Sequence, residues 1–188
     1  KDNLVSTRMS DQITIAAANL EPWYRQPNLR HVRMSKGTEV HNLGEGSAEI
    51  LITTMMSEKY PRTSTTLTQH GLLTYGGVVV DYAHRGPTYG SRTWLKGNQA
   101  RFYLRDLMLR DILSHRRPPD VVLRAHVHSP VHEVLETGGY TSNLFIVPPF
   151  CLMDEYAVSA TQSLEEVITG ILVIEIIDGE ITAFERLY

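Results

Sequence analysis

The sequence is poor in cysteine. A single cysteine among 188 residues, Cys151, excludes an internal disulfide and a zinc site built from several thiolates. We expect Cys151 to be a small core residue, which is the usual place of a free cysteine.

The sequence also lacks a long apolar run and an excess of positive charge. Its longest apolar run, Ile171–Ile174 resumed at Ile176–Ile177, is far shorter than the roughly 20 residues that span a bilayer. No signal peptide opens the chain, so we expect a cytoplasmic protein without membrane contact. The net charge of −3 does not favour binding to nucleic acid. A local basic patch stays open as an alternative, formed by four arginines: Arg85, Arg92, Arg116 and Arg117.

The composition is that of a globular protein. Hydrophobic residues make up 42% and charged residues 21% of the chain, which is typical of a folded domain. The length predicts one domain over residues 1–188. Because Lys1 is not methionine and Lys1–Arg8 has no strand pattern, we expect this domain to be incomplete at its N-terminus.

Helical and strand patterns alternate along the chain. Helices are predicted from Asp11 to about Leu20, with Ser10 as cap, over Ser47–Met56, and from Asn98 to about His115. Lys59–Thr68 is predicted to be a polar loop. Strands are predicted over several short runs: Leu29–Met34, Gly71–Thr74, Val78–Tyr82, Val121–Val131, His132–Leu135 and Leu144–Val147.

The tail carries the clearest hairpin pattern. Two apolar strands within Gly170–Leu187 flank the turn residues Asp178 and Gly179, which tolerate positive φ. With the preceding elements, this pattern predicts an α/β fold, a layered α/β sandwich with mixed sheets flanked by helices and a C-terminal β-hairpin. The edge of that hairpin can pair with a second chain, which would make an oligomer.

The stretch Val121–Val131 carries the strongest chemical signal. Its apolar residues lead into His126-Val127-His128, and residues two apart on a strand point to the same face. Two imidazoles leaving one face can converge on neighbouring metal ions, which in two-metal hydrolytic sites lie about 3.5–4 Å apart. The alternative is a pair of solvated histidines on an edge strand.

Four of the eight histidines follow predicted strands or glycine turns: His41, His84, His126 and His128. Imidazole is a common ligand for divalent metals, and a protonated imidazole can donate a proton to a leaving oxygen. Ligands in mixed sheets usually bind beyond the carboxyl ends of strands. For the other four, His31, His70, His115 and His132, we expect structural roles.

The order of these segments resembles the calcineurin-like metallophosphoesterases, as a divergent prokaryotic or viral member. Gly37-Thr38-Glu39-Val40-His41 is similar to that family's Gly-Asn-His block. Ala83-His84-Arg85-Gly86-Pro87 is similar to its isolated-histidine block. Ala125-His126-Val127-His128 is similar to its Gly-His-x-His block, with alanine in place of glycine. The resemblance covers about residues 10–135. The family's Asp-x-His and Gly-Asp blocks have no counterpart here, and would lie before Lys1.

The resemblance implies roles for these residues. His84 and His126 would bind one metal ion, His128 would bind a second, and His41 would protonate the leaving alkoxide. The family's amide ligand falls at Thr38, a poorer ligand, for which Glu39 or Asn42 can substitute. The implied cofactors are two divalent metal ions. Manganese, zinc, iron and nickel are all compatible with histidine and carboxylate ligands.

Three functions follow as alternatives. The first is a metal-dependent phosphoesterase, in which a metal-activated hydroxide attacks a phosphomonoester or phosphodiester. The second is a non-catalytic member that uses the same scaffold as a structural or interaction module, which the missing carboxylates favour. The third is a one-metal or unrelated hydrolase. Activity would require the Asp-x-His and Gly-Asp blocks to exist upstream.

Overall fold

The computed structural model of the protein describes residues 8–37, 47–87, 95–127, 129–149 and 169–187. The chain divides into two compact units, residues 1–69 and residues 70–188. Each unit has its own helices and strands, and of the four candidate histidines His41 belongs to the first unit and the other three to the second. The single domain over residues 1–188 stays a prediction.

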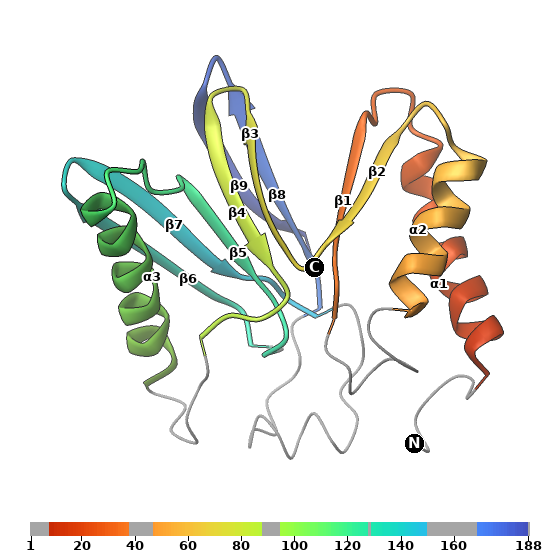
Figure 1. The fold of residues 1–188 in the computed structure, drawn as a ribbon, viewed down its shortest axis with the longest axis horizontal. Helices are drawn as coiled ribbons and strands as arrows, with labels where there is room; N and C mark the ends of the chain where they lie inside the picture. Colours follow the sequence, from red (N-terminus) through yellow and green to blue (C-terminus); the bar gives the residue numbers. More distant parts are fainter. Residues whose placement is uncertain (1–7, 38–46, 88–94, 128, 150–168, 188) are drawn as a thin grey trace. The chain divides into compact units, whose positions relative to one another are not determined.

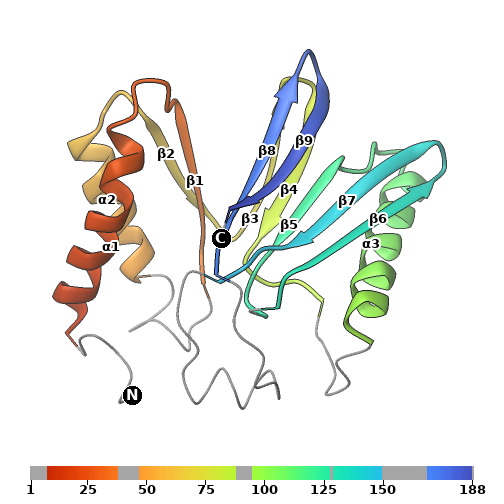
Figure 2. The same ribbon diagram turned by 180° about the vertical axis from the view of Figure 1, so that it is seen from behind.

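The first unit is a small β-α-β arrangement preceded by a helix. Its elements are α1 (Met9–Tyr24), β1 (His31–Ser35), α2 (Ser47–Lys59) and β2 (Ser64–Thr68). β1 and β2 pair in parallel, so the connection between them has to cross over, and α2 makes that crossover. Both helices lie on the same side of the two strands (Figure 2). Tyr24 is buried there, and its hydroxyl lies 2.9 Å from Thr65 Oγ1.

The second unit contains a five-stranded mixed sheet, a helix and a hairpin (Figure 1). The strand order in the sheet is β3-β4-β5-β7-β6, in which β4, β5 and β7 are parallel and the two outer strands antiparallel. The bounds of its elements are β3 (His70–Tyr75), β4 (Val78–Ala83), α3 (Lys96–Leu113), β5 (Val121–Arg124), β6 (Val131–Thr137), β7 (Tyr140–Ile146), β8 (Ile171–Ile177) and β9 (Glu180–Leu187).

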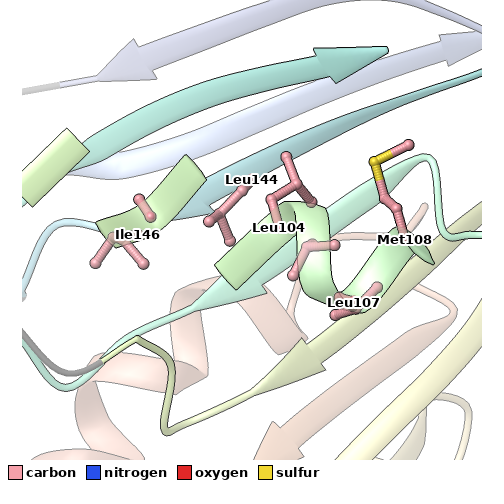
Figure 3. Packing of buried hydrophobic residues seen from close by; sticks show 7 residues of the cluster. Leu104, Leu107, Met108, Leu144 and Ile146 are labelled. Carbon is pink, nitrogen blue, oxygen red and sulfur yellow. The ribbon is translucent and has the colours of Figure 1, made fainter. Parts of the chain in front are cut away.

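Alternation along the central strands builds a core on each face of this sheet. On one face, Leu144 and Ile146 pack against the buried side of α3, formed by Leu104, Leu107 and Met108 (Figure 3). On the other face, Val121 and Phe145 pack against apolar side chains of the β8–β9 hairpin. Neighbouring residues of a strand point to opposite faces, so a continuous apolar run covers both. The prediction of layered α/β structure with a C-terminal hairpin is confirmed.

The hairpin turn forms where the sequence predicts it. Asp178 has a φ of 51° and Gly179 a φ of 87°, the two positive values that a two-residue type I′ turn requires. A Cβ on Gly179 would also lie 3.1 Å from the carbonyl oxygen of Gly76. Within the described ranges, none of the helices is long and apolar enough to cross a membrane.

Several predicted boundaries are wrong. α1 begins at Met9 without a side-chain cap and continues through Pro22, because the missing proline N–H costs only one hydrogen bond so close to the helix end. α3 begins at Lys96 after Leu95, so Asn98 is not its cap. The predicted loop Lys59–Thr68 contains β2, whose three threonines suit a strand because threonine is β-branched.

The predicted strand Val121–Val131 is also too long. β5 ends at Arg124, and His126 has a φ of 73°, which no strand residue has. The shared-face argument for His126 and His128 therefore fails for His126, which lies in a turn beyond the strand. His128 lies outside the described residues.

Candidate metal centre

Two of the four candidate histidines meet at one edge of the five-stranded sheet. His84 directly follows β4, and His126 follows β5 by one intervening residue. β4 and β5 are parallel neighbours, so their carboxyl ends lie at the same edge. The backbone N–H of Ala125 donates to the carbonyl of His84 over 3.1 Å, which continues the pairing one step past the strands. This pairing brings together two residues that are 42 positions apart in the sequence.

The two imidazoles touch through nitrogen atoms. His84 Nε2 lies 3.0 Å from His126 Nδ1. The ring centroids are 4.9 Å apart and the ring planes meet at 61°. Without a metal, one of the two nitrogens carries a proton and donates it to the other.

The backbone at His126 aims its ring into this contact. A φ of 73° is uncommon for a residue other than glycine, although histidine, asparagine and aspartate adopt it more often than most. The N–H of Val127 donates to the carbonyl of Ala125 over 2.9 Å, which closes a tight turn around His126. An unusual backbone conformation at a site of this kind is consistent with a functional constraint.

The donor pair fits part of a metal site. Zinc–nitrogen bonds of about 2.0–2.1 Å at a tetrahedral angle place two ligand nitrogens about 3.3–3.4 Å apart. The observed 3.0 Å is within a few tenths of an ångström of that separation. Two ligands do not complete a site, and among the described residues no three His, Cys, Asp or Glu side chains gather as a metal-binding group. The other predicted metal ligand, His128, and the predicted proton donor, His41, lie outside the described residues, as do Thr38, Glu39 and Asn42.

Three of the other four histidines make local contacts. His70 Nε2 lies 2.8 Å from Asp81 Oδ2. His132 stacks on Phe145 with ring centroids 4.1 Å apart. His115 has a φ of 54° just beyond α3, and its N–H donates to the carbonyl of Ile112. His31 is exposed at the start of β1.

Two buried charges next to the histidine pair were missed by the sequence analysis. Asp81 on β4 and Arg124 on β5 have exposed fractions of 7% and 2%. Asp81 Oδ1 lies 2.5 Å from Arg124 Nη1, and Arg124 Nε donates to the hydroxyl of Tyr103 on α3 over 2.8 Å. The pair lies on the face that α3 covers, where Asp81 is opposite Val122 and Arg124 is opposite Ile146.

A sequence signal for this pair exists. Each strand begins with an apolar triplet that is followed by one charged residue, VVVD for Val78–Asp81 and VVLR for Val121–Arg124. Each charged residue stands two or three positions before a site histidine. Opposite charges at matching places in two buried strands predict an ion pair, because an isolated buried charge is very costly.

The predicted basic patch is reduced by local ion pairs. Arg116 Nη2 lies 2.7 Å from Asp111 Oδ1, and Arg117 Nη2 lies 2.9 Å from Asp120 Oδ1. Arg85 is exposed, and Arg92 lies outside the described residues. Two of the four arginines are therefore matched by an aspartate each.

No family model matches the sequence. The search of curated proteins found no match either. Solved structures similar to this chain include a single mutant of Vps29 from Entamoeba histolytica, with a TM-score of 0.43 and 11% identity, covering 93% of this chain and 88% of that one. Wild-type Vps29 of the same organism, complexed with Zn²⁺, has a TM-score of 0.42 and 14% identity, covering 90% and 87%.

A third similar structure is protein TM1076 of Thermotoga maritima, solved in solution, with a TM-score of 0.41 and 15% identity, covering 84% of this chain and 98% of that one.

Proposed function

We propose that this chain is a divergent metallophosphoesterase, a metal-dependent enzyme that hydrolyses a phosphomonoester or phosphodiester. The observation that carries the proposal is the 3.0 Å contact between His84 Nε2 and His126 Nδ1 at the carboxyl ends of two parallel strands. The motif order around both histidines supports it. Each of the two nitrogens has a lone pair for a metal ion when its proton is on the opposite ring atom.

The proposal gives each histidine a role. His84 and His126 hold one divalent metal ion, and His128 contributes to a second. His41 donates a proton to the leaving oxygen, which a protonated imidazole within hydrogen-bond reach can do. Bound metal ions supply charge neutralisation at phosphate oxygens and activation of water. Manganese, zinc, iron and nickel are all suitable for imidazole ligands, so availability decides among them.

A non-catalytic member of the same fold is the second candidate. One observation favours it: the carboxylate of Asp81, three residues before His84, is already in contact with Arg124 and His70. A catalytic two-metal site needs carboxylates as well as imidazoles to neutralise and bridge its ions. In this alternative the chain acts as an interaction module, and His84 and His126 form a hydrogen bond without binding a metal ion.

Metal content and turnover of bis-p-nitrophenyl phosphate, measured together with added manganese on the full-length protein, test the proposal. We expect bound metal and turnover in the wild type. Replacing either ligand, in His84→Ala or His126→Ala, should remove both. His31→Ala is the matched control, since His31 is an exposed histidine at the start of β1, and should retain both.

The outcomes separate the candidates. Bound metal without turnover, lost in His126→Ala, would support a metal-binding module without this activity. No metal and no turnover in a folded wild-type protein would overturn the enzyme and leave the interaction module.

A further inference from the structure

We infer that the buried ion pair between Asp81 and Arg124 is the device that positions His84 against His126, so that both residues are positioning residues of this site. The inference rests on the proposed function only for its metal readout, because the contact between the two rings exists without a metal.

Arg124 connects three elements at the end of the sheet. Its Nη1 contacts Asp81 Oδ1 on β4 at 2.5 Å and donates to the backbone carbonyl of Leu123 on β5 over 2.8 Å. Its Nε donates to Tyr103 on α3. Asp81 stands three residues before His84, and Arg124 stands two before His126. Asp81, two residues before the end of β4, and Arg124, the last residue of β5, are therefore bound to each other shortly before the chain reaches the two histidines.

Stability alone does not account for charges at these places. Their neighbours on the same face, Val122 and Ile146, are apolar and fully buried. Replacing a buried ion pair by apolar residues of similar volume is often neutral or stabilising, because the desolvation of two charges offsets their attraction. What an ion pair adds over an apolar pair is direction, since each guanidinium N–H needs one acceptor at one place.

Arg124 also contacts the chain on the far side of His84. A Cβ added to Gly86 would lie 2.8 Å from Arg124 Cβ and 2.9 Å from Cγ, so the backbone after His84 runs directly along the arginine side chain. His84 is thus fixed before it through Asp81 and after it through Gly86, in both cases by Arg124. The hydrogen bond from Ala125 N–H to the His84 carbonyl fixes the residue itself.

A double variant tests the inference without leaving either member of the Asp81–Arg124 pair as a lone buried charge. Asp81→Leu with Arg124→Met replaces the ion pair by apolar side chains, and we expect it to fold with a thermal midpoint near that of the wild type. Its Zn²⁺ affinity, measured by calorimetry, should fall about 10- to 100-fold, the usual cost of removing groups that orient metal ligands. Zinc chloride alone is the probe.

The matched control removes a different ion pair, between α3 and the edge strand β6. Arg101 Nη2 lies 3.0 Å from Glu133 Oε2, and β7 separates β6 from β5. Arg101→Met with Glu133→Gln should leave the zinc affinity within about twofold. A loss of affinity equal to that of the double variant would mean that removing any ion pair of the sheet has this effect, and would overturn the inference.

A metal-free readout keeps the inference testable if the wild type binds no zinc. Contacts between the rings of His84 and His126 can be measured by proton NMR in metal-free protein. We expect them in the wild type and in the control, and expect their loss in the double variant. A folded double variant that keeps the ring contacts would overturn the inference, whereas failure of zinc binding in the wild type alone would overturn only the proposed metal site.

Discussion

Single residues at the end of β4 and β5 have two kinds of role. His84 and His126 carry reactive nitrogens, whereas Asp81, Arg124 and Tyr103 form the hydrogen-bonded support beside them. A buried arginine needs an acceptor for each N–H, because a buried donor without a partner costs the full desolvation of that group. The hydrogen bonds around Arg124 are therefore sensitive to the loss of a single acceptor atom.

Tyr103→Phe removes one acceptor from this support. We expect the free energy of unfolding to fall by about 1–3 kcal/mol, since Arg124 Nε loses its partner in a buried place. Denaturant titration measures it. Tyr75→Phe is the control, because Tyr75 is 62% exposed, and should change stability by less than about 0.5 kcal/mol. Equal effects of the two substitutions would contradict the role of the Tyr103 hydroxyl.

At the scale of elements, α1 and α2 are joined by a cluster of polar groups around Glu21. Its Oε1 accepts hydrogen bonds from Lys59 and Tyr60 of the α2 end and from Arg25 of its own helix end. The hydrogen bonds from Lys59 and Tyr60 and the nearby Arg25 lower the pKa of Glu21 to about 2 from its ordinary value of 4.5. The carboxylate is thus favoured in the folded state.

Glu21→Gln tests this cluster through its pH dependence. A carboxyl group whose pKa is lowered by folding stabilises the protein fully above its unfolded pKa, and that stability is lost as pH falls through the folded pKa. The wild type should exceed the variant in thermal midpoint at pH 6. The difference should shrink between pH 4.5 and about pH 2. A difference that is constant over this range would contradict the prediction.

At the scale of the whole molecule, metal binding to the folded chain should raise its stability. A ligand that binds only the folded state at 100 times its dissociation constant stabilises it by about 2.7 kcal/mol. We expect added Zn²⁺ to raise the thermal midpoint of the wild type by about 5–10 °C, since each kcal/mol shifts a chain of this size by about 2–4 °C. A chelator should reverse the shift, and His126→Ala should show none. An equal shift in that variant would place the metal elsewhere.

The sequence by itself determined the elements that depend on local chemistry. Asp178 and Gly179 predict the C-terminal turn, since positive φ is a property of these residue types. Helical spacing puts Leu104, Leu107, Met108 and Ile112 on one side of α3, and the first three form its buried face. Element type and layer order follow from such patterns. The predicted helix end before Pro22 and the predicted helix cap at Asn98 were wrong, because packing extends helices beyond their local signals.

Only the tertiary structure decided which side chains meet. His84 and His126 are 42 positions apart, and no periodicity links them until β4 pairs with β5. The motif predicted His84 and His126 as ligands of one metal. The sequence pattern placed His126 on a strand, whereas the positive φ of His126 in the turn after Arg124 orients its ring. The ion pair of Asp81 and Arg124 likewise forms only because β4 pairs with β5. The register between strands that are distant in the sequence depends on the whole core, because it is set by which strand faces are buried together.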